Sequence, residues 1–166
     1  SSRAAFATGN WDTFKLFLNY PPTPEIAVEQ PEAVGLENGD TKQFGSVSLG
    51  ASRSPMSFTI RNRGLADLTV ANVAVIGGNA GDFVVNTDAM AKTVGAKATT
   101  TFNVVFTPSS LGVRTTTLRI TSNDADEEII DIILVGSAPV AGGQMTDNFD
   151  DDTLDPVKWL NGKKGH

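Results

Sequence analysis

The sequence contains no cysteine and a single histidine, His166, which is its last residue. Without cysteine there is no disulfide framework, no zinc–thiolate site and no cysteine nucleophile. A lone histidine at a chain end is not expected to act as a base, so a Ser-His-Asp mechanism lacks that component. No pattern marks two carboxylates facing a cleft, as a glycosidase needs. We therefore expect no catalytic residues and no enzyme activity in this chain.

Long apolar runs and clusters of positive charge are also scarce. No stretch approaches the roughly 18 apolar residues that a membrane-spanning helix needs. The first residues, SSRAAF, lack the continuous apolar core of a signal peptide, which suits either a cytosolic protein or an internal piece of a longer exported chain. The net charge of −6 argues against a nucleic-acid partner, because little basic surface is available to neutralise phosphates.

What the sequence does contain is β-strand patterning, which is clearest over residues 95–136. Three strand-like runs, 100–106, 113–121 and 129–135, are separated by turn-forming clusters at 108–112 and 122–126. Apolar and polar residues alternate along the first two runs, so each predicted strand has one buried face. Because short loops join the three runs, we predict an antiparallel meander.

Further strands are predicted upstream, over 25–29, 44–50, 55–61, 68–76 and 83–85. In 44–50 the shared face is formed by Val47 and Leu49, and in 68–76 a change of parity predicts a bulge around Ala71–Asn72. Strands at about 10-residue spacing indicate an all-β fold, an immunoglobulin-like antiparallel β-sandwich of seven or eight strands with flanking extended segments. The predicted core consists of Phe58, Ile60, Phe102, Val104, Phe106, Leu118, Ile120 and Ile132.

Composition divides the chain into a sandwich at 25–138 and flanking segments. Residues 1–20 end in a strand-like apolar stretch, which we interpret as the end of a preceding domain or as an added edge strand. A proline-rich linker follows at 21–24, and a second linker lies at 139–146. Residues 147–166 are interpreted as the truncated start of a following domain.

Two acidic clusters are the candidates for a metal site. The first includes Asp124 and Asp126, in a predicted hairpin loop, and the second includes Asp150 and Asp152. Carboxylates in loops can coordinate calcium, but the second cluster lacks the glycine and the terminal glutamate of an EF-hand loop. In the first cluster the Asn123–Asp124 pair is equally typical of a turn. Charged runs are usually solvated, so we expect turns, no bound metal and no cofactor.

Several short motifs follow one another along the chain in a fixed order: Phe44–Val47, Leu49–Gly50, Phe58–Gly64, Leu68–Val70, Gly81–Phe83, Val105–Pro108, Gly112, Ile120–Asp124 and Leu134–Gly136. Together these motifs resemble the bacterial choice-of-anchor D domain, a member of the ASH (abnormal-spindle and Hydin-like) group of immunoglobulin-like modules. The resemblance spans roughly residues 24–138, and it departs from the family at Arg63, where a small polar residue such as threonine is usual.

This resemblance implies a non-enzymatic repeat or spacer in a large exported bacterial protein, located outside the cell or at its surface. Its partners would be neighbouring domains or other subunits, and the family supplies no catalytic or ligand-binding residues to transfer. Separately, residues 145–159 resemble the first strand of a concanavalin-like jelly roll, a domain found in carbohydrate-active exported proteins.

Two alternative functions remain. A carbohydrate-binding accessory module of a secreted hydrolase would bind a polysaccharide through exposed aromatics, for which Trp11, Tyr20 and Trp159 are the candidates, although such residues are more often core aromatics. A self-assembling subunit would use the apolar segment 11–20 to complete another subunit's sheet by strand addition.

Overall fold

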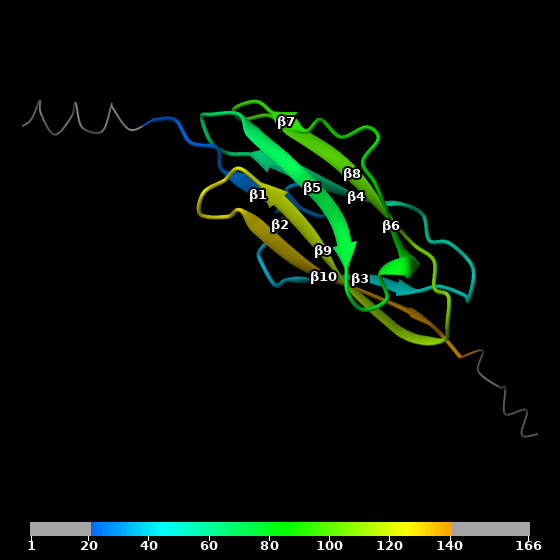
Figure 1. The fold of residues 1–166 in the computed structure, drawn as a ribbon. Helices are drawn as coiled ribbons and strands as arrows, with labels where there is room; N and C mark the ends of the chain where they lie inside the picture. Colours follow the sequence, from blue (N-terminus) through cyan, green and yellow to red (C-terminus); the bar gives the residue numbers. More distant parts are fainter. Residues whose placement is uncertain (1–20, 141–166) are drawn as a thin grey trace, which may run out of the picture.

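The structure, a computed structural model, describes residues 21–140 and places their strands in two packed sheets (Figure 1). One five-stranded sheet has the order β2 (Gly35–Leu36), β1 (Ile26–Glu29), β4 (Met56–Asn62), β8 (Thr99–Phe106), β6 (Phe83–Asn86). The other has the order β3 (Thr41–Ser46), β10 (Ile129–Ala138), β9 (Gly112–Ser122), β5 (Leu68–Ile76), β7 (Thr93–Val94). A short 3-10 helix, η1 (Ala80–Asp82), precedes β6.

The predicted all-β sandwich is confirmed, with ten strands in the described residues in place of seven or eight. The two additional strands, β2 and β7, contain two residues each, which is too short to produce an alternation that a sequence pattern can reveal. None of the described residues forms a helix long and apolar enough to cross a membrane.

The predicted three-stranded meander is wrong, because β8 and β9 belong to different sheets. β8 pairs with β4 and β6, whereas β9 pairs with β10 and β5. The chain crosses from one sheet to the other over residues 107–111. Alternation predicts which side chains of a strand are buried. Because both sheets bury one face against the same core, alternation does not reveal whether two successive strands pair in one sheet or lie in opposite sheets. Only the β9–β10 hairpin of the meander is present.

The strand expected at 44–50 lies earlier, at Thr41–Ser46, and the side chain of Leu49 is 51% exposed. Gly45 has a φ of 73°, and the pairing of β3 with β10 shifts register at that point. A residue with positive φ disturbs the strand and ends the simple alternation that the pattern assumed. The pairing of β3 with β10 is parallel, an exception in an otherwise antiparallel sandwich.

The core lies between the sheets, and all eight predicted core residues are at most 2% exposed. The rings of Phe58 and Phe102 stack with centroids 5.3 Å apart. The bulge predicted in β5 is confirmed, since Val70 pairs with Ser122 and Asn72 with Thr121.

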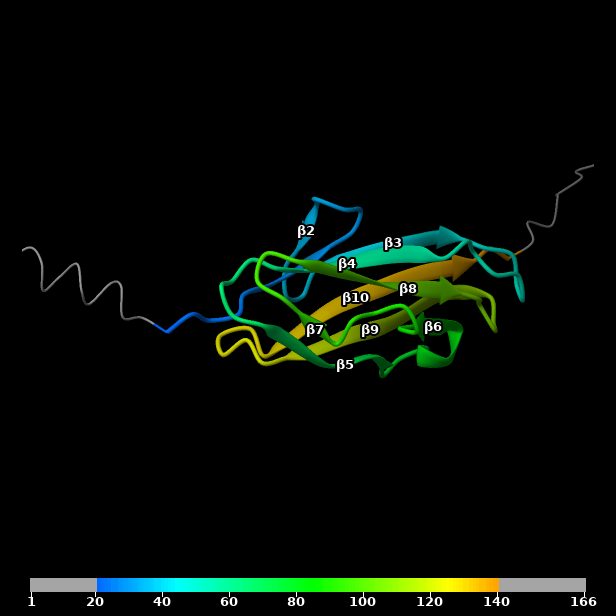
Figure 2. The same ribbon diagram turned by 90° about the horizontal axis from the view of Figure 1, so that it is seen from above.

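The described chain enters and leaves the sandwich at opposite ends, as both ribbon views show (Figures 1 and 2). The first part of the described chain lies at one end and its last part at the other, with the strands running between them. We call these the entry end and the exit end.

Candidate functional site

At the entry end, the buried side chain of Asn62 connects three separate segments. Its Nδ2 group donates hydrogen bonds to the carbonyl oxygens of Ala66 (2.7 Å), Val94 (2.9 Å) and Gly95 (3.2 Å). Its Oδ1 atom accepts hydrogen bonds from the backbone N–H groups of Gly64 (2.9 Å) and Glu25 (3.3 Å). One amide therefore joins the entering chain, the loop after β4 and the end of β7.

The entering chain packs directly on that loop. The carbonyl of Thr23 accepts hydrogen bonds from the N–H groups of Leu65 (2.9 Å) and Ala66 (3.2 Å), and the N–H of Arg63 donates to the carbonyl of Glu25 (2.7 Å). A Cβ atom on Gly64 would lie only 2.3 Å from the Thr23 oxygen, so glycine is needed for this close approach. We call these contacts, between residues 23–25 and residues 62–66, the entry clamp.

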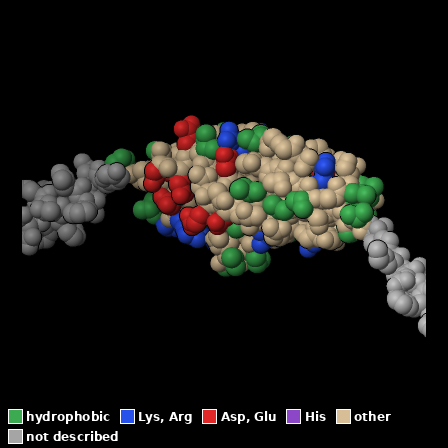
Figure 3. Space-filling model, turned by 90° about the horizontal axis from the view of Figure 1, so that it is seen from below, with side chains coloured by type: hydrophobic (Ala, Val, Ile, Leu, Met, Phe, Trp, Pro, Cys, Tyr) green, Lys and Arg blue, Asp and Glu red, His purple; other side chains and the backbone are tan. Residues whose placement is uncertain are grey.

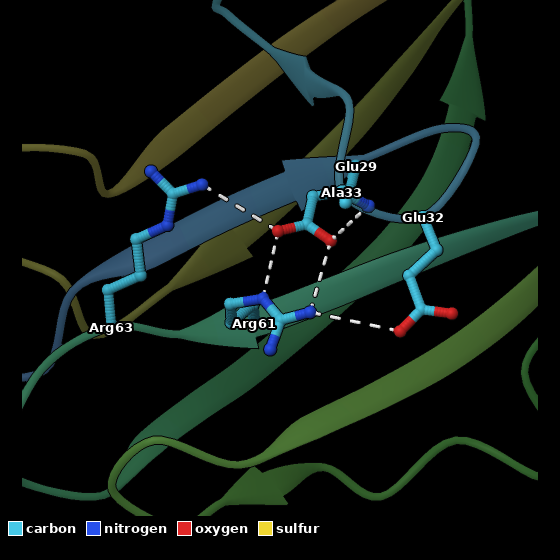
Figure 4. Close-up of polar contacts among 5 residues, drawn as sticks. All are labelled: Glu29, Glu32, Ala33, Arg61 and Arg63. Carbon is cyan, nitrogen blue, oxygen red and sulfur yellow. Dashed lines mark hydrogen bonds and ion pairs between the residues drawn. The ribbon is translucent and has the colours of Figure 1, made fainter.

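A second polar network lies on the outer face of the sheet that contains β1 (Figure 4). The carboxylate of Glu29 accepts hydrogen bonds from Arg61 Nε (2.8 Å), Arg61 Nη2 (3.3 Å) and the Ala33 N–H (2.9 Å). Arg63 Nη2 lies 3.6 Å from the same carboxylate, and Glu32 Oε1 lies 3.9 Å from Arg61 Nη2.

These contacts lower the pKa of Glu29 from 4.5 to about 2, mainly through the hydrogen bonds from Arg61 and then through the one from the Ala33 N–H. A carboxylate that stays ionised and has partners on both oxygens is poorly suited to transfer protons. The arrangement holds the loop that contains Ala33 against the sheet, so we assign it a structural role.

The predicted metal candidates Asp124 and Asp126 lie together at the entry end, beside Glu25. Carboxylate oxygens of these three residues all lie within 4.8 Å of one another. Asp124 is only 2% exposed, and its Oδ2 atom accepts a hydrogen bond from the Ile26 N–H at 2.8 Å. The sequence does not predict Glu25 as a member of this cluster, because no local pattern reveals that the start of β1 packs beside the β9–β10 loop.

Negative charge accumulates around this cluster. Burial raises the pKa of Glu127, and the nearby carboxylates of Asp124, Glu25, Glu37 and Asp126 raise it further. Figure 3 shows carboxylate side chains gathered toward the entry end on the face that it displays. The other two metal candidates, Asp150 and Asp152, lie outside the described residues.

The aromatic residues proposed as a sugar-binding platform, Trp11, Tyr20 and Trp159, also lie outside the described residues, as does His166. Within residues 21–140 every aromatic residue is a phenylalanine, and each of these is at most 2% exposed: Phe44, Phe58, Phe83, Phe102 and Phe106. The described sandwich therefore presents no aromatic side chain on which a sugar could stack.

Two packed sheets with a buried phenylalanine-rich core and a parallel β3–β10 pair define an immunoglobulin-like sandwich. Residues 40–128 match the ASH family (Abnormal spindle-like microcephaly-assoc'd, ASPM-SPD-2-Hydin), and the chain belongs to that family. The resemblance to the ASH group expected from the sequence is therefore confirmed. ASH domains are non-catalytic immunoglobulin-like interaction modules. Comparison with curated protein sequences finds no match.

Comparison with solved structures finds several matches. A protein of unknown function from Porphyromonas gingivalis W83 is 13% identical with a TM-score of 0.52, over 70% of this chain and 46% of that one. The ASH/PapD-like domain 7 of human CEP192 is 13% identical with a TM-score of 0.47, over 72% and 88%. The Escherichia coli chaperone DraB is 11% identical with a TM-score of 0.46, over 73% and 58%. This chain thus spans less than half the length of the Porphyromonas protein, and that likeness is one of fold alone.

Proposed function

We propose that this chain is a non-enzymatic spacer and interaction module of a large exported multidomain bacterial protein, working outside the cell or at its surface. It would hold neighbouring domains apart, and its partners would be those domains or other subunits. The entry clamp is the main support for this proposal. A spacer can fix the position of a neighbouring domain only if the chain that connects them is bound to the spacer, and residues 23–25 are hydrogen-bonded to residues 62–66.

Two further features support this role. The entry and exit of the described chain lie at opposite ends of the sandwich, which suits a module inserted between two others (Figure 1). The entering segment also contains Pro21, Pro22 and Pro24, and proline restricts the backbone to extended conformations that favour a stiff connection.

A distance measurement across the sandwich tests the proposal. Because the chain has no cysteine, the substitutions Thr23→Cys and Val140→Cys give two unique sites for spin labels at its two ends. Double electron–electron resonance on the full chain should give one narrow distance distribution. A reference pair within the strands, Thr101→Cys with Thr115→Cys, sets the width that the labels alone produce. An end-to-end distribution much broader than this reference would contradict the spacer proposal.

The two alternatives predict different measurements on the same full chain. A carbohydrate-binding module should be retained on a polysaccharide, and retention should fall when Trp11 or Trp159 is replaced by alanine. For a self-assembling subunit, the mass measured by light scattering should rise with protein concentration. The mass should return to the monomer value when a substitution such as Leu16→Asp breaks the apolar alternation of segment 11–20. The spacer proposal predicts neither result.

A further inference from the structure

Three segments meet at the exit end of the sandwich. The loop after β3 joins the loop after β8 through a hydrogen bond from the Gly50 N–H to the Pro108 carbonyl, 3.0 Å long. The same loop joins the end of β10 through the Val47 N–H and the Ser137 carbonyl, 2.8 Å apart. The start of β9 pairs with the last residue of β10.

These segments expose apolar side chains close to the point where the chain leaves the sandwich. Leu49 is 51% exposed, Leu111 48%, Val113 70% and Val140 70%. We call these four residues the exit patch. They account for four of the nine large hydrophobic side chains exposed in residues 21–140, and Figure 3 shows hydrophobic side chains gathered at this end, beside the exit of the chain. Grouped exposure of this kind, unlike scattered single residues, is typical of a contact surface.

The loops of the exit end contain no acidic side chain, and the neighbouring Asp82, whose carbonyl accepts a hydrogen bond from the Thr107 N–H, is 3% exposed and pairs with Arg114. Residues 47–53, 107–113 and 137–140 contain no aspartate or glutamate. Arg53 is exposed there, donates a hydrogen bond to the Phe44 carbonyl and forms no ion pair with any carboxylate of the described residues. An apolar surface with an adjacent positive charge fits a partner that combines apolar and acidic side chains.

The next part of the same chain has this composition. Residues 145–160 contain the apolar side chains Met145, Phe149, Leu154, Val157, Trp159 and Leu160. They also contain the carboxylates Asp147, Asp150, Asp151, Asp152 and Asp155. The segment begins shortly after Val140, and an extended connection of this length reaches about 15 Å, enough to return to the exit patch.

We propose that residues 145–160 pack on the exit patch of their own chain, with apolar side chains on Leu111 and Val113 and aspartates close to Arg53. This contact goes beyond a spacer role, because it would fix the orientation of the following part of the protein relative to the sandwich. Covalent connection gives the segment a high effective concentration at the patch, which favours it over a separate molecule.

Tryptophan fluorescence of the full chain tests the proposal. The sequence has two tryptophans, so Trp11→Phe leaves Trp159 as the only one. In this background we expect a blue-shifted Trp159 emission that acrylamide quenches weakly. Leu111→Asp and Val113→Asp should shift the emission to the red and restore quenching. The matched control is Val34→Asp, at a position that is 52% exposed and lies outside the exit patch, and it should change neither signal.

A variant in a different loop, Leu49→Asp, should have the same effect on Trp159 as Leu111→Asp, so the result does not depend on a single variant. Circular dichroism verifies that each variant is folded. Arg53→Gln should weaken protection in low salt more than in high salt. A Trp159 that is fully solvent-exposed in the Trp11→Phe chain would overturn the proposal. Protection that appears only with a rise in mass by light scattering would also overturn it, in favour of a second copy as the occupant.

Discussion

The backbone of Gly136 on β10 lies against the ring of Phe106 on β8, so closely that a Cβ atom on this glycine would be 2.4 Å from Phe106 Cε1. The contact joins the two sheets, because β8 and β10 belong to opposite layers of the sandwich. The same ring packs against Phe83, with centroids 4.7 Å apart, and against Phe44, with centroids 6.1 Å apart. The absence of a side chain at Gly136 thus leaves room for the aromatic cluster.

Gly136→Ala should destabilise the sandwich. The added methyl group overlaps the Phe106 ring, and overpacking of a dense core typically costs about 1–3 kcal/mol. Urea unfolding measures the change in the free energy of unfolding. The control is Gly35→Ala, since a Cβ atom at Gly35 meets nothing within 4 Å. Equal stabilities of the two variants would contradict the packing described for Gly136.

Phe106→Ala should cost more, about 3–5 kcal/mol, because it removes a fully buried ring and leaves a cavity between the sheets. Val84→Ala is the control, since the Val84 side chain is 58% exposed and its truncation should change the unfolding free energy by less than about 0.5 kcal/mol. A cost below about 1 kcal/mol for Phe106→Ala, the size of an ordinary surface change, would contradict its central place in the core.

Glu29→Gln should destabilise the protein at neutral pH by about 1–3 kcal/mol, since it weakens charged hydrogen bonds to Arg61. The pKa of Glu29 is about 2 in the folded protein against an ordinary value of 4.5. Its stabilising contribution is therefore complete above pH 4.5 and is lost as the pH falls from 4.5 toward 2. The stability difference between wild type and variant should shrink across that range.

Thermal unfolding as a function of pH measures that difference. Replacement of the exposed Glu128 by glutamine is the control and should cost little at any pH. The depressed pKa of Glu29 predicts that the stability deficit of Glu29→Gln shrinks below pH 4.5. A deficit that stays constant from pH 7 to pH 2.5 would contradict the ion pair.

Calcium should not bind the cluster of Glu25, Asp124 and Asp126 in a saturable way. Calcium takes about six to eight oxygen ligands, whereas one oxygen of Asp124 already accepts the Ile26 N–H. We expect no saturating rise in the unfolding temperature up to about 1 mM calcium, a concentration at which extracellular calcium modules are occupied. A rise that saturates with calcium, is absent with magnesium and disappears in Asp126→Asn would contradict this expectation.

The burial of individual side chains could be predicted from the sequence, because alternation with a period of two fixes which residues share a face of a strand. Phe102, Val104 and Phe106 were recognised as core residues on this basis. The sheet to which each strand belongs could not be predicted in the same way. β8 and β9 are adjacent in sequence with a short loop between them, and this arrangement suits a hairpin and a crossing between sheets equally well.

The candidate sites could likewise be predicted only in part, because local sequence patterns do not reveal contacts made by tertiary packing. Asp124 and Asp126 were predicted as a pair because they lie in one loop, but the proximity of Glu25 depends on tertiary packing. Asn62 belongs to a family motif recognised in the sequence, yet its role in the entry clamp depends on partners at Glu25, Val94 and Gly95. No local pattern connects these positions. Segment 21–24 was interpreted as a linker from its prolines, and the hydrogen bonds of Thr23 show that part of it is bound to the sandwich.

The entry clamp fixes the entering chain to the sandwich, and the backbone order of the Thr23 and Glu25 amides measures how firmly it does so. Nuclear magnetic resonance relaxation on the full chain gives an order parameter for each amide. The entry clamp predicts values near those of the β4 and β8 strands, about 0.85, for both residues. Values below about 0.6, typical of a flexible backbone, would contradict the clamp and with it the proposed spacer.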